Sequence, residues 1–163
     1  MDKKLQKAFN DQIKHEVYSA YLYLAMSAYV ETKNLPGFSH WLKVQFKEEL
    51  GHAMKQFEFL VDRGERVTLQ AVPQPPAEFA SPLDIFEKVL EHEKKVTGLI
   101  HALSNLAREV NDTAAEIFLQ WFVTEQVEEE QQACAIVEKL RLAGDKGSTL
   151  LYLDKEFGKR GKD

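Results

Sequence analysis

A glutamate and a histidine lie one helical turn apart in the short stretch KEELGHA, residues 47–53. In a helix, Glu49 and His52 share one face with Phe46 and Ala53, because residues three and four apart are neighbours on a helix surface. A carboxylate and an imidazole side by side are common ligands of a metal cation. A single Glu-x-x-His pair is weak support for a metal site, so the rest of the chain must supply further ligands.

Three more glutamates stand on apolar stripes in the same way. Each lines up with apolar residues at i±3, i±4 or i±7: Phe9, Ile13, Ala20 and Tyr23 for Glu16; Phe86, Val89, Leu90, Val96 and Ile100 for Glu93; Phe122, Ala133 and Ile136 for Glu129. Apolar residues at this spacing form the face that a helix turns toward the core. We therefore expect four carboxylates to point inward near the middle of four helices.

The two halves of the chain resemble each other weakly. WLKVQFKEE ends at Glu49 and WFVTEQVEE ends at Glu129, each with a tryptophan eight residues before its last glutamate. Glu16 and Glu93 each follow a histidine. A bundle of two such helical hairpins has approximate two-fold symmetry, and its glutamates would meet near the axis.

Four buried carboxylates need a source of positive charge. Each loses hydration on burial and repels the others, and no Lys or Arg stands on these stripes near the acids. Two divalent cations would balance four negative charges, and His52 would add a neutral nitrogen ligand. Oxygen ligands with one histidine suit iron or manganese, so the pattern predicts a two-metal centre that reacts with O₂.

Helix-forming residues fill long stretches between the few sites of Gly and Pro. They predict five helices: one at about 3–32, one with Pro36 in its first turn that ends near Gly64, one from Pro82 to near Asn111, one from Thr113 to Gly144, and a short one at about 148–158. Asn34 and Ser81 are the expected N-caps of the second and third helices, and Thr113 with Glu116 forms an expected capping box.

The connections predict the topology. Short first and third links join antiparallel neighbours. The second link, about 65–81, contains about 17 residues that extend to ~56 Å, whereas a 28-residue helix is ~42 Å long. We predict an all-α, antiparallel four-helix bundle with one long crossover between helices two and three. It forms a single domain, 1–163, with the bundle at about 3–143 and a flexible tail at 159–163. A PxxP-type ligand for another domain is the alternative for the proline-rich link.

Composition excludes several other classes of protein. The net charge of −5 among 163 residues and the lack of a basic stripe argue against nucleic-acid binding. No apolar run approaches the length of a membrane span, and the start MDKKLQKAF lacks the apolar stretch of a secretory signal. The single cysteine, Cys134, excludes an internal disulfide framework and fits a reducing cytosol, so we expect a cytoplasmic protein.

Over nearly its whole length the chain resembles the prokaryotic non-haem ferritins. The resemblance rests on HEVYSAYLYL at 15–24, FKEELGHAMK at 46–55, the His-Glu pair at 92–93 and FVTEQVEEE at 122–130. It implies a ferritin-like bundle whose fifth helix closes an axis of a hollow shell of identical subunits. The family's shells have 24 subunits in octahedral symmetry. Fe(II) and O₂ or H₂O₂ are the implied substrates of a ferroxidase that stores ferric mineral.

The resemblance also implies roles for particular residues. Glu16, Glu49 and His52 would hold one iron, while Glu49 would bridge to a second iron held by Glu93 and Glu129, with Gln126 alongside. A third iron site, present in many prokaryotic members, matches Glu48, Glu125, Glu128 and Glu129, and Tyr23 matches a tyrosine that supplies an electron.

Relatives of other kinds fit less well. Bacterioferritins bind haem through a methionine after the second-helix glutamate, where this chain has Leu50, and carry a histidine where it has Gln132. No haem is therefore expected. Two alternatives remain from the residues alone: a diiron-carboxylate oxidase or peroxidase without storage, and a structural helical bundle. We expect Cys134 to be a small apolar core residue, and His15 and His92 to face outward or an interface.

Overall fold

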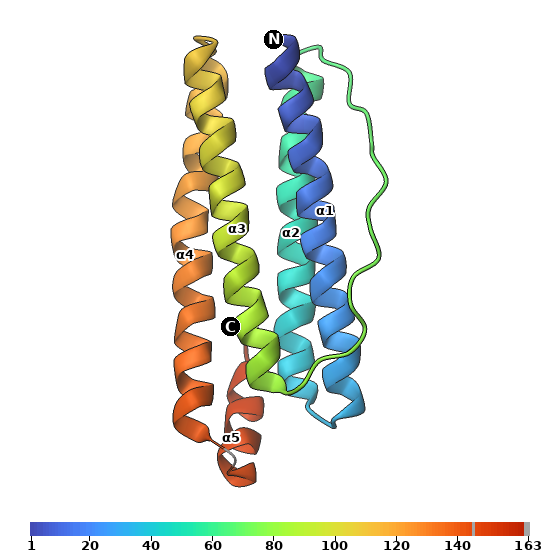
Figure 1. Cartoon of the computed structure of the whole chain (residues 1–163), viewed down its shortest axis with the longest axis vertical. Helices are drawn as coiled ribbons and strands as arrows, with labels where there is room; N and C mark the ends of the chain where they lie inside the picture. The colour runs from blue at the N-terminus through green and yellow to red at the C-terminus, as the bar shows by residue number, and fades with distance from the viewer. Residues whose placement is uncertain (145, 162–163) are drawn as a thin grey trace.

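The computed structural model describes residues 1–144 and 146–161, which form five helices and, within these ranges, no strand. The helices are α1 (Lys3–Thr32), α2 (Pro36–Asp62), α3 (Pro82–Glu109), α4 (Thr113–Ala143) and α5 (Gly147–Phe157). Four long helices lie side by side and the short α5 packs at one end (Figure 1). The predicted all-α bundle is confirmed, and the helix bounds agree with the sequence within two or three residues. None of the described helices is both long enough and apolar enough to cross a membrane.

The crossover from α2 to α3 runs along the outside of α1 for most of the bundle's length (Figure 1). It is fastened to α1 by side chains: the Thr68 amide donates to Asn10 Oδ1 at 2.6 Å, and Gln70 Nε2 donates to Asp11 Oδ1 at 2.6 Å. Because the link travels the length of the bundle, α2 and α3 are parallel while the pairs α1–α2 and α3–α4 are antiparallel. The long crossover predicted for this link is present.

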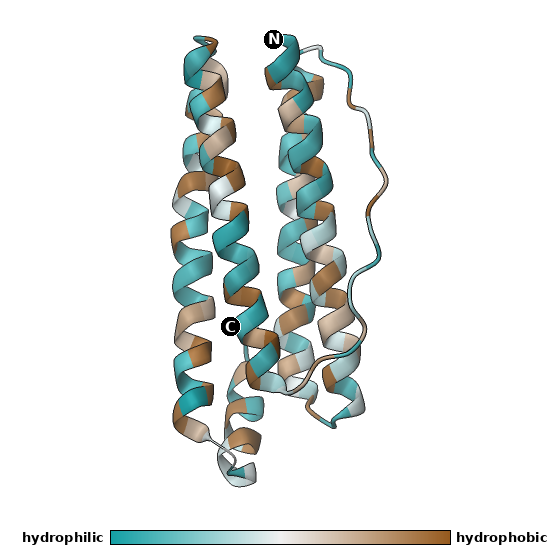
Figure 2. Ribbon diagram, in the orientation of Figure 1, coloured by the Kyte–Doolittle hydropathy of each residue, from teal (hydrophilic) through white to brown (hydrophobic). Residues whose placement is uncertain are grey.

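Hydrophilic and hydrophobic residues alternate along each long helix (Figure 2), the pattern of helices with one face in a core. The core itself is divided in two. One cluster surrounds Tyr23, Phe38 and Phe86 at the end that carries α5, and the other surrounds Phe9, Ile100 and Phe122 at the opposite end. Between them lies a polar layer, defined by Glu16, Glu49, His52, Glu93, Gln126 and Glu129, all buried.

Two of the three expected helix caps are wrong. Ser81 caps α3 as predicted, with Oγ accepting from the Asp84 amide. α4 is capped by Asp112, whose Oδ1 accepts from the Ala115 amide at 3.1 Å, so Thr113 lies inside the helix. Asp112 also forms two hydrogen bonds with Arg63, which holds it in place. Asn34 does not cap α2; it adopts φ of 57° in the preceding turn.

The cap of α2 comes from α5 instead. Asp154 Oδ1 accepts from the Phe38 amide at 2.9 Å, which satisfies a free N–H of the first turn of α2. Phe157 packs edge-on against Phe38, with ring centroids 5.0 Å apart. The close approach requires Gly37, since a Cβ on that residue would lie 1.6 Å from the Asp154 carbonyl oxygen.

Gly37→Ala is therefore expected to destabilise the protein by about 1–3 kcal/mol, the usual cost of overpacking. The matched control is Gly98→Ala in α3, where a Cβ meets nothing within 4 Å. That change should leave stability equal or up to ~1 kcal/mol higher, since alanine is the better helix former. Urea unfolding of both variants measures the difference. Equal stability of the two would contradict the tight packing of α5 on α2.

Candidate metal centre

The polar layer gathers one buried glutamate from each long helix. Glu16 comes from α1, Glu49 and His52 from α2, Glu93 from α3, and Gln126 and Glu129 from α4, with exposed fractions between 1% and 6%. The helical spacing that predicted their inward orientation also explains it, because each shares a face with core residues. The sequence thus placed the side chains of this layer correctly.

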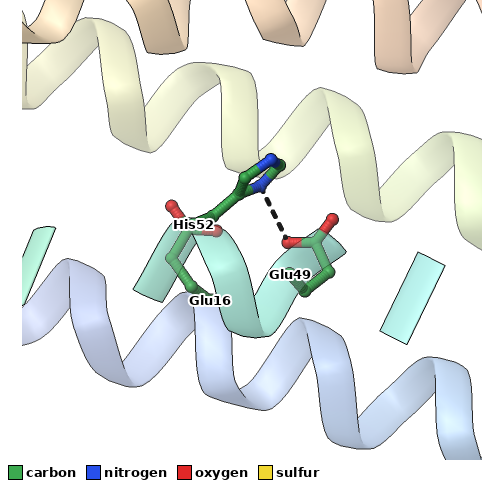
Figure 3. A group of neighbouring side chains, drawn as sticks. All are labelled: Glu16, Glu49 and His52. Atoms are coloured by element: carbon green, nitrogen blue, oxygen red, sulfur yellow. Dashed lines mark ion pairs between the residues drawn. The ribbon is translucent and has the colours of Figure 1, made fainter. Parts of the chain in front are cut away.

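Three of these side chains form a compact group. Ligand atoms of Glu16, Glu49 and His52 all lie within 4.8 Å of one another. Figure 3 shows Glu16 from α1 and Glu49 and His52 from α2 with their side chains directed to the same side, toward α3, and with His52 Nδ1 3.5 Å from Glu49 Oε2. The His52 ring is also held edge-on by Trp121, at 5.4 Å between ring centroids. The arrangement supplies oxygen and nitrogen ligands to one cation.

A second group contains His52, Glu125 and Glu129, again within 4.8 Å. Glu93 belongs to neither group and is held by neutral donors. The Tyr23 hydroxyl donates to Glu93 Oε1, and Gln126 Nε2 donates to Glu93 Oε2 at 3.2 Å. Gln126 therefore orients Glu93 in this structure.

Three buried glutamines that sequence reasoning missed hold the other carboxylates. Gln12 and Gln56 both donate to Glu16 Oε1, at 3.1 and 2.9 Å. Gln45 donates to Glu49 Oε1 at 3.2 Å and to Glu129 Oε2 at 2.8 Å. Their spacing was an available signal, because Gln12 and Gln45 each precede a layer glutamate by four residues on the same helix face. Amide donors orient a carboxylate without neutralising its charge.

Among the fully buried oxygen atoms of the layer, Glu16 Oε2 has no hydrogen-bond partner within the described residues. Glu16 Oε1 accepts two amide hydrogen bonds, whereas the buried Glu16 Oε2 accepts none. An unpaired buried carboxylate oxygen is costly unless something else binds it. A hard cation fits this oxygen and its neighbours Glu49 and His52.

Burial raises the pKa of every carboxyl group in the layer. It raises the pKa of Glu16 to about 8, with the nearby charge of Glu49 as the next cause. It raises the pKa of Glu129 to about 7, helped by Glu93. The pKa values of Glu49 and Glu93 are also raised, first by burial. Without a cation the layer therefore retains protons near neutral pH, which a bound cation would displace.

The residues expected at a third site have different surroundings. Glu125 lies beside Glu129 and His52. Glu48 is instead paired with Arg160, at 2.6 Å between Oε2 and Nη2, and Glu128 is exposed. Arg160 belongs to the segment 159–163, expected to be a flexible tail; residues 162 and 163 lie outside the described residues.

Three further residues named in the sequence analysis lie outside the layer. Cys134 is exposed, so its prediction as an apolar core residue is wrong. His92 is partly buried and 2.8 Å from Ser19 Oγ, with a pKa that burial lowers to about 4. Leu50, at the position of the haem methionine in bacterioferritins, is partly exposed.

The fold and the layer together define a class: a four-helix bundle with a long crossover and a buried, carboxylate-rich centre that one glutamate from each helix builds. Comparison with known proteins agrees. A family model described as "Ferritin-like domain" matches residues 6–143. The chain belongs to the ferritin family.

Individual relatives are similar along the full length. Proteins named bacterial non-heme ferritin are 41% identical in Bacteroides fragilis (strain 638R), over 98% of this chain and 99% of the relative, and 39% identical in Staphylococcus saprophyticus, over 100% and 98%. A crystal structure described as a novel open pore ferritin from the archaeon Archaeoglobus fulgidus is 53% identical. It has a TM-score of 0.97 and covers 98% of this chain and 99% of its own.

Proposed function

We propose that the protein stores iron and acts as a ferroxidase, oxidising Fe(II) to Fe(III) with O₂ at a centre within each subunit. The observation that carries the proposal is the convergence of four buried carboxylates and one histidine. Within the described residues, no Lys or Arg forms an ion pair with these four glutamates. Membership of the ferritin family supports iron as the cation.

In this proposal Glu16, Glu49 and His52 bind the first Fe(II). Glu49 also reaches the second Fe(II), which Glu93 and Glu129 bind, while Gln126 and Tyr23 orient Glu93 through their hydrogen bonds. Glu48, Glu125, Glu128 and Glu129 are the residues for a third iron. In that case Glu48 must exchange its ion pair with Arg160 for the cation.

The residues of the layer would supply three things. They bring two substrate ions to within about 4 Å, the usual two-metal spacing, so that one O₂ meets both. Their negative charge favours Fe(III) over Fe(II). Their raised pKa values mean that Fe(II) binding releases protons from Glu16 and Glu129. The step balances when two Fe(II) each lose one electron and O₂ with two protons becomes H₂O₂.

Storage requires an enclosed cavity, so we propose that the subunits form a homo-oligomeric shell. Exposed apolar side chains near the α5 end, Leu142, Leu151 and Tyr152, are suited to contacts between subunits. Twenty-four chains of 18.7 kDa, the octahedral assembly expected from the resemblance, would give a particle of about 450 kDa. We further propose a cytoplasmic protein without haem, consistent with Leu50 at the methionine position.

Addition of Fe(II) in air to the metal-free protein tests the function. Near-ultraviolet absorbance of Fe(III) should rise rapidly for the first two Fe(II) per chain and continue far beyond this ratio while the iron stays in solution with the protein. Saturation at about two ions per chain would instead indicate a diiron oxidase without storage. Oxidation no faster than in buffer would indicate a structural bundle.

A further inference from the structure

Arg160 returns from the end of α5 to the side of α2. Its guanidinium donates from Nη1 to Gln45 Oε1 at 2.9 Å and from Nη2 to Glu48 Oε2 at 2.6 Å. It also lies over the ring of Trp41, 4.3 Å from the centroid, and its carbonyl oxygen is 2.8 Å from His40 Nε2. With a side chain only 17% exposed, Arg160 is held on α2 by contacts on several sides.

The contact with Gln45 determines which way that amide faces. A guanidinium can only donate, so it requires the amide oxygen of Gln45. The amide nitrogen then points to the opposite side, where it donates to Glu129 Oε2 at 2.8 Å and Glu49 Oε1 at 3.2 Å. If the amide were reversed, its oxygen would face two carboxylates and its N–H groups would face the positively charged guanidinium of Arg160. Gln45 is fully buried, so water cannot compensate for either contact.

The approximate two-fold repeat relates the position of Arg160 to that of a residue in the other half of the centre. In the first half of the centre His52 is flanked by Trp121, over which Lys55 Nζ lies at 4.1 Å. The position equivalent to His52, three residues after Glu129, is Gln132. In this second half the guanidinium of Arg160 lies over the equivalent tryptophan, Trp41, as Lys55 lies over Trp121. Its Nη2 is 3.4 Å from Gln132 Oε1. The half of the centre that lacks a histidine thus has an arginine from the C-terminal segment.

We propose that Arg160 is a positioning residue of the metal centre: by fixing the amide of Gln45, it holds Glu49 and Glu129 in the arrangement that binds the second cation. This inference rests on the proposed function. Arg160 does not touch the cation; its effect passes through one buried amide to the two carboxylates.

If the guanidinium acted only through its charge, loss of Arg160 would change the affinity for cations in the opposite direction. A fixed positive charge near the centre, paired with Glu48, repels a divalent cation and competes for that carboxylate. Loss of the arginine would then strengthen cation binding. Under the positioning role, loss of the arginine weakens binding, because the Gln45 amide can turn and its two carboxylates lose their donor. The direction of the change therefore separates the two.

Arg160→Met is the suitable variant, since methionine keeps apolar contact with Trp41 and removes the donors. Co(II) is the probe, titrated without O₂ into the metal-free assembled protein by calorimetry and by visible absorption. We expect affinity for the second Co(II) to fall by up to about tenfold, the low end of the effect of losing an outer-shell partner. The control, Lys159→Met, changes the exposed neighbour that pairs with Glu156 and should bind as the unmodified protein does.

A double-mutant cycle tests the route through Gln45. Gln45→Met should weaken the second Co(II) by itself, and adding Arg160→Met should then change little. Unchanged or tighter binding in Arg160→Met, or an independent additional loss in the double variant, overturns the inference. Failure of the unmodified protein to bind two Co(II) per chain overturns the proposed function and this inference with it. Rapid Fe(II) oxidation by unmodified protein together with normal Co(II) binding by Arg160→Met overturns the inference alone.

Discussion

Glu49→Gln is expected to abolish rapid Fe(II) oxidation and at the same time to stabilise the metal-free protein. Glu49 is the carboxylate that both proposed iron sites share, so its loss should lower the initial oxidation rate by about 100-fold or more, at least as much as the loss of an outer-shell partner. The same carboxyl group is buried beside Glu93 and Glu129, which together with burial raise its pKa. Glutamine has the same shape and no charge, and it removes this cost.

The stabilisation should appear as a higher urea midpoint at pH 8, because burial and the nearby carboxylates, which raise the pKa of Glu49, disfavour its charged form in the folded protein. Single-turnover oxidation of two Fe(II) per chain and urea unfolding of metal-free protein measure the two effects. Glu58→Gln, an exposed glutamate on the same helix, is the control and should change neither. Oxidation at the unmodified rate by Glu49→Gln would exclude a centre at Glu49.

The opposite signs of these two effects follow from a general property of binding sites. A centre arranged for cations is unfavourable without them, since four carboxylates are held together at the expense of folding stability. The polar layer lies between two apolar clusters that supply that stability. Function and stability are thus separated along the axis of the bundle.

Helical spacing was sufficient to predict the layer. Glu16, Glu49, Glu93 and Glu129 each share a helix face with apolar residues three, four or seven positions away, and local periodicity alone determines such a face. The crossover was predictable for a similar reason, because its length and prolines are local properties. The inward orientation of the four glutamates, which depends on the periodicity of each helix alone, was therefore predicted correctly.

Contacts between distant segments were not predictable in this way. Asp154 caps α2 across 116 residues and Arg160 reaches Gln45 across 115, and no spacing rule connects such pairs. The choice between two neighbouring N-cap candidates also led to a wrong prediction. Asp112 and Thr113 are both good N-cap residues, and two hydrogen bonds from Arg63 hold Asp112 in the capping position. Cys134 lies five residues after Glu129, a separation of 140° around the helix, which places it on the exposed side.

Stability is expected to fall with rising pH in the metal-free protein, and this dependence should disappear when the centre binds a cation. In metal-free protein Glu16 has a pKa of about 8 and Glu129 a pKa of about 7, against 4.5 for an ordinary glutamate. Between pH 4.5 and these values the folded protein binds more protons than the unfolded chain, so stability falls as pH rises through this window. Below pH 6.5 the lowered pKa of His92 opposes the trend, because the unfolded histidine then binds the extra proton.

At pH 7 and pH 8 an unfolded histidine is mostly neutral, so urea unfolding at these two values reports chiefly the carboxyl groups, although the pKa values of both His15 and His92 are lowered. Metal-free protein should be less stable at pH 8, and Glu16→Gln should reduce the difference because it removes the group with the higher pKa. With Co(II) at one concentration that saturates the centre at both pH values, each carboxyl group holds the cation instead of a proton. The metal-bound protein should therefore be about equally stable at the two pH values, since neither it nor the unfolded chain binds carboxyl protons there. Equal or greater stability of the metal-free protein at pH 8 would mean that the four carboxyl groups are not buried together, and the cation would then have no charge to balance.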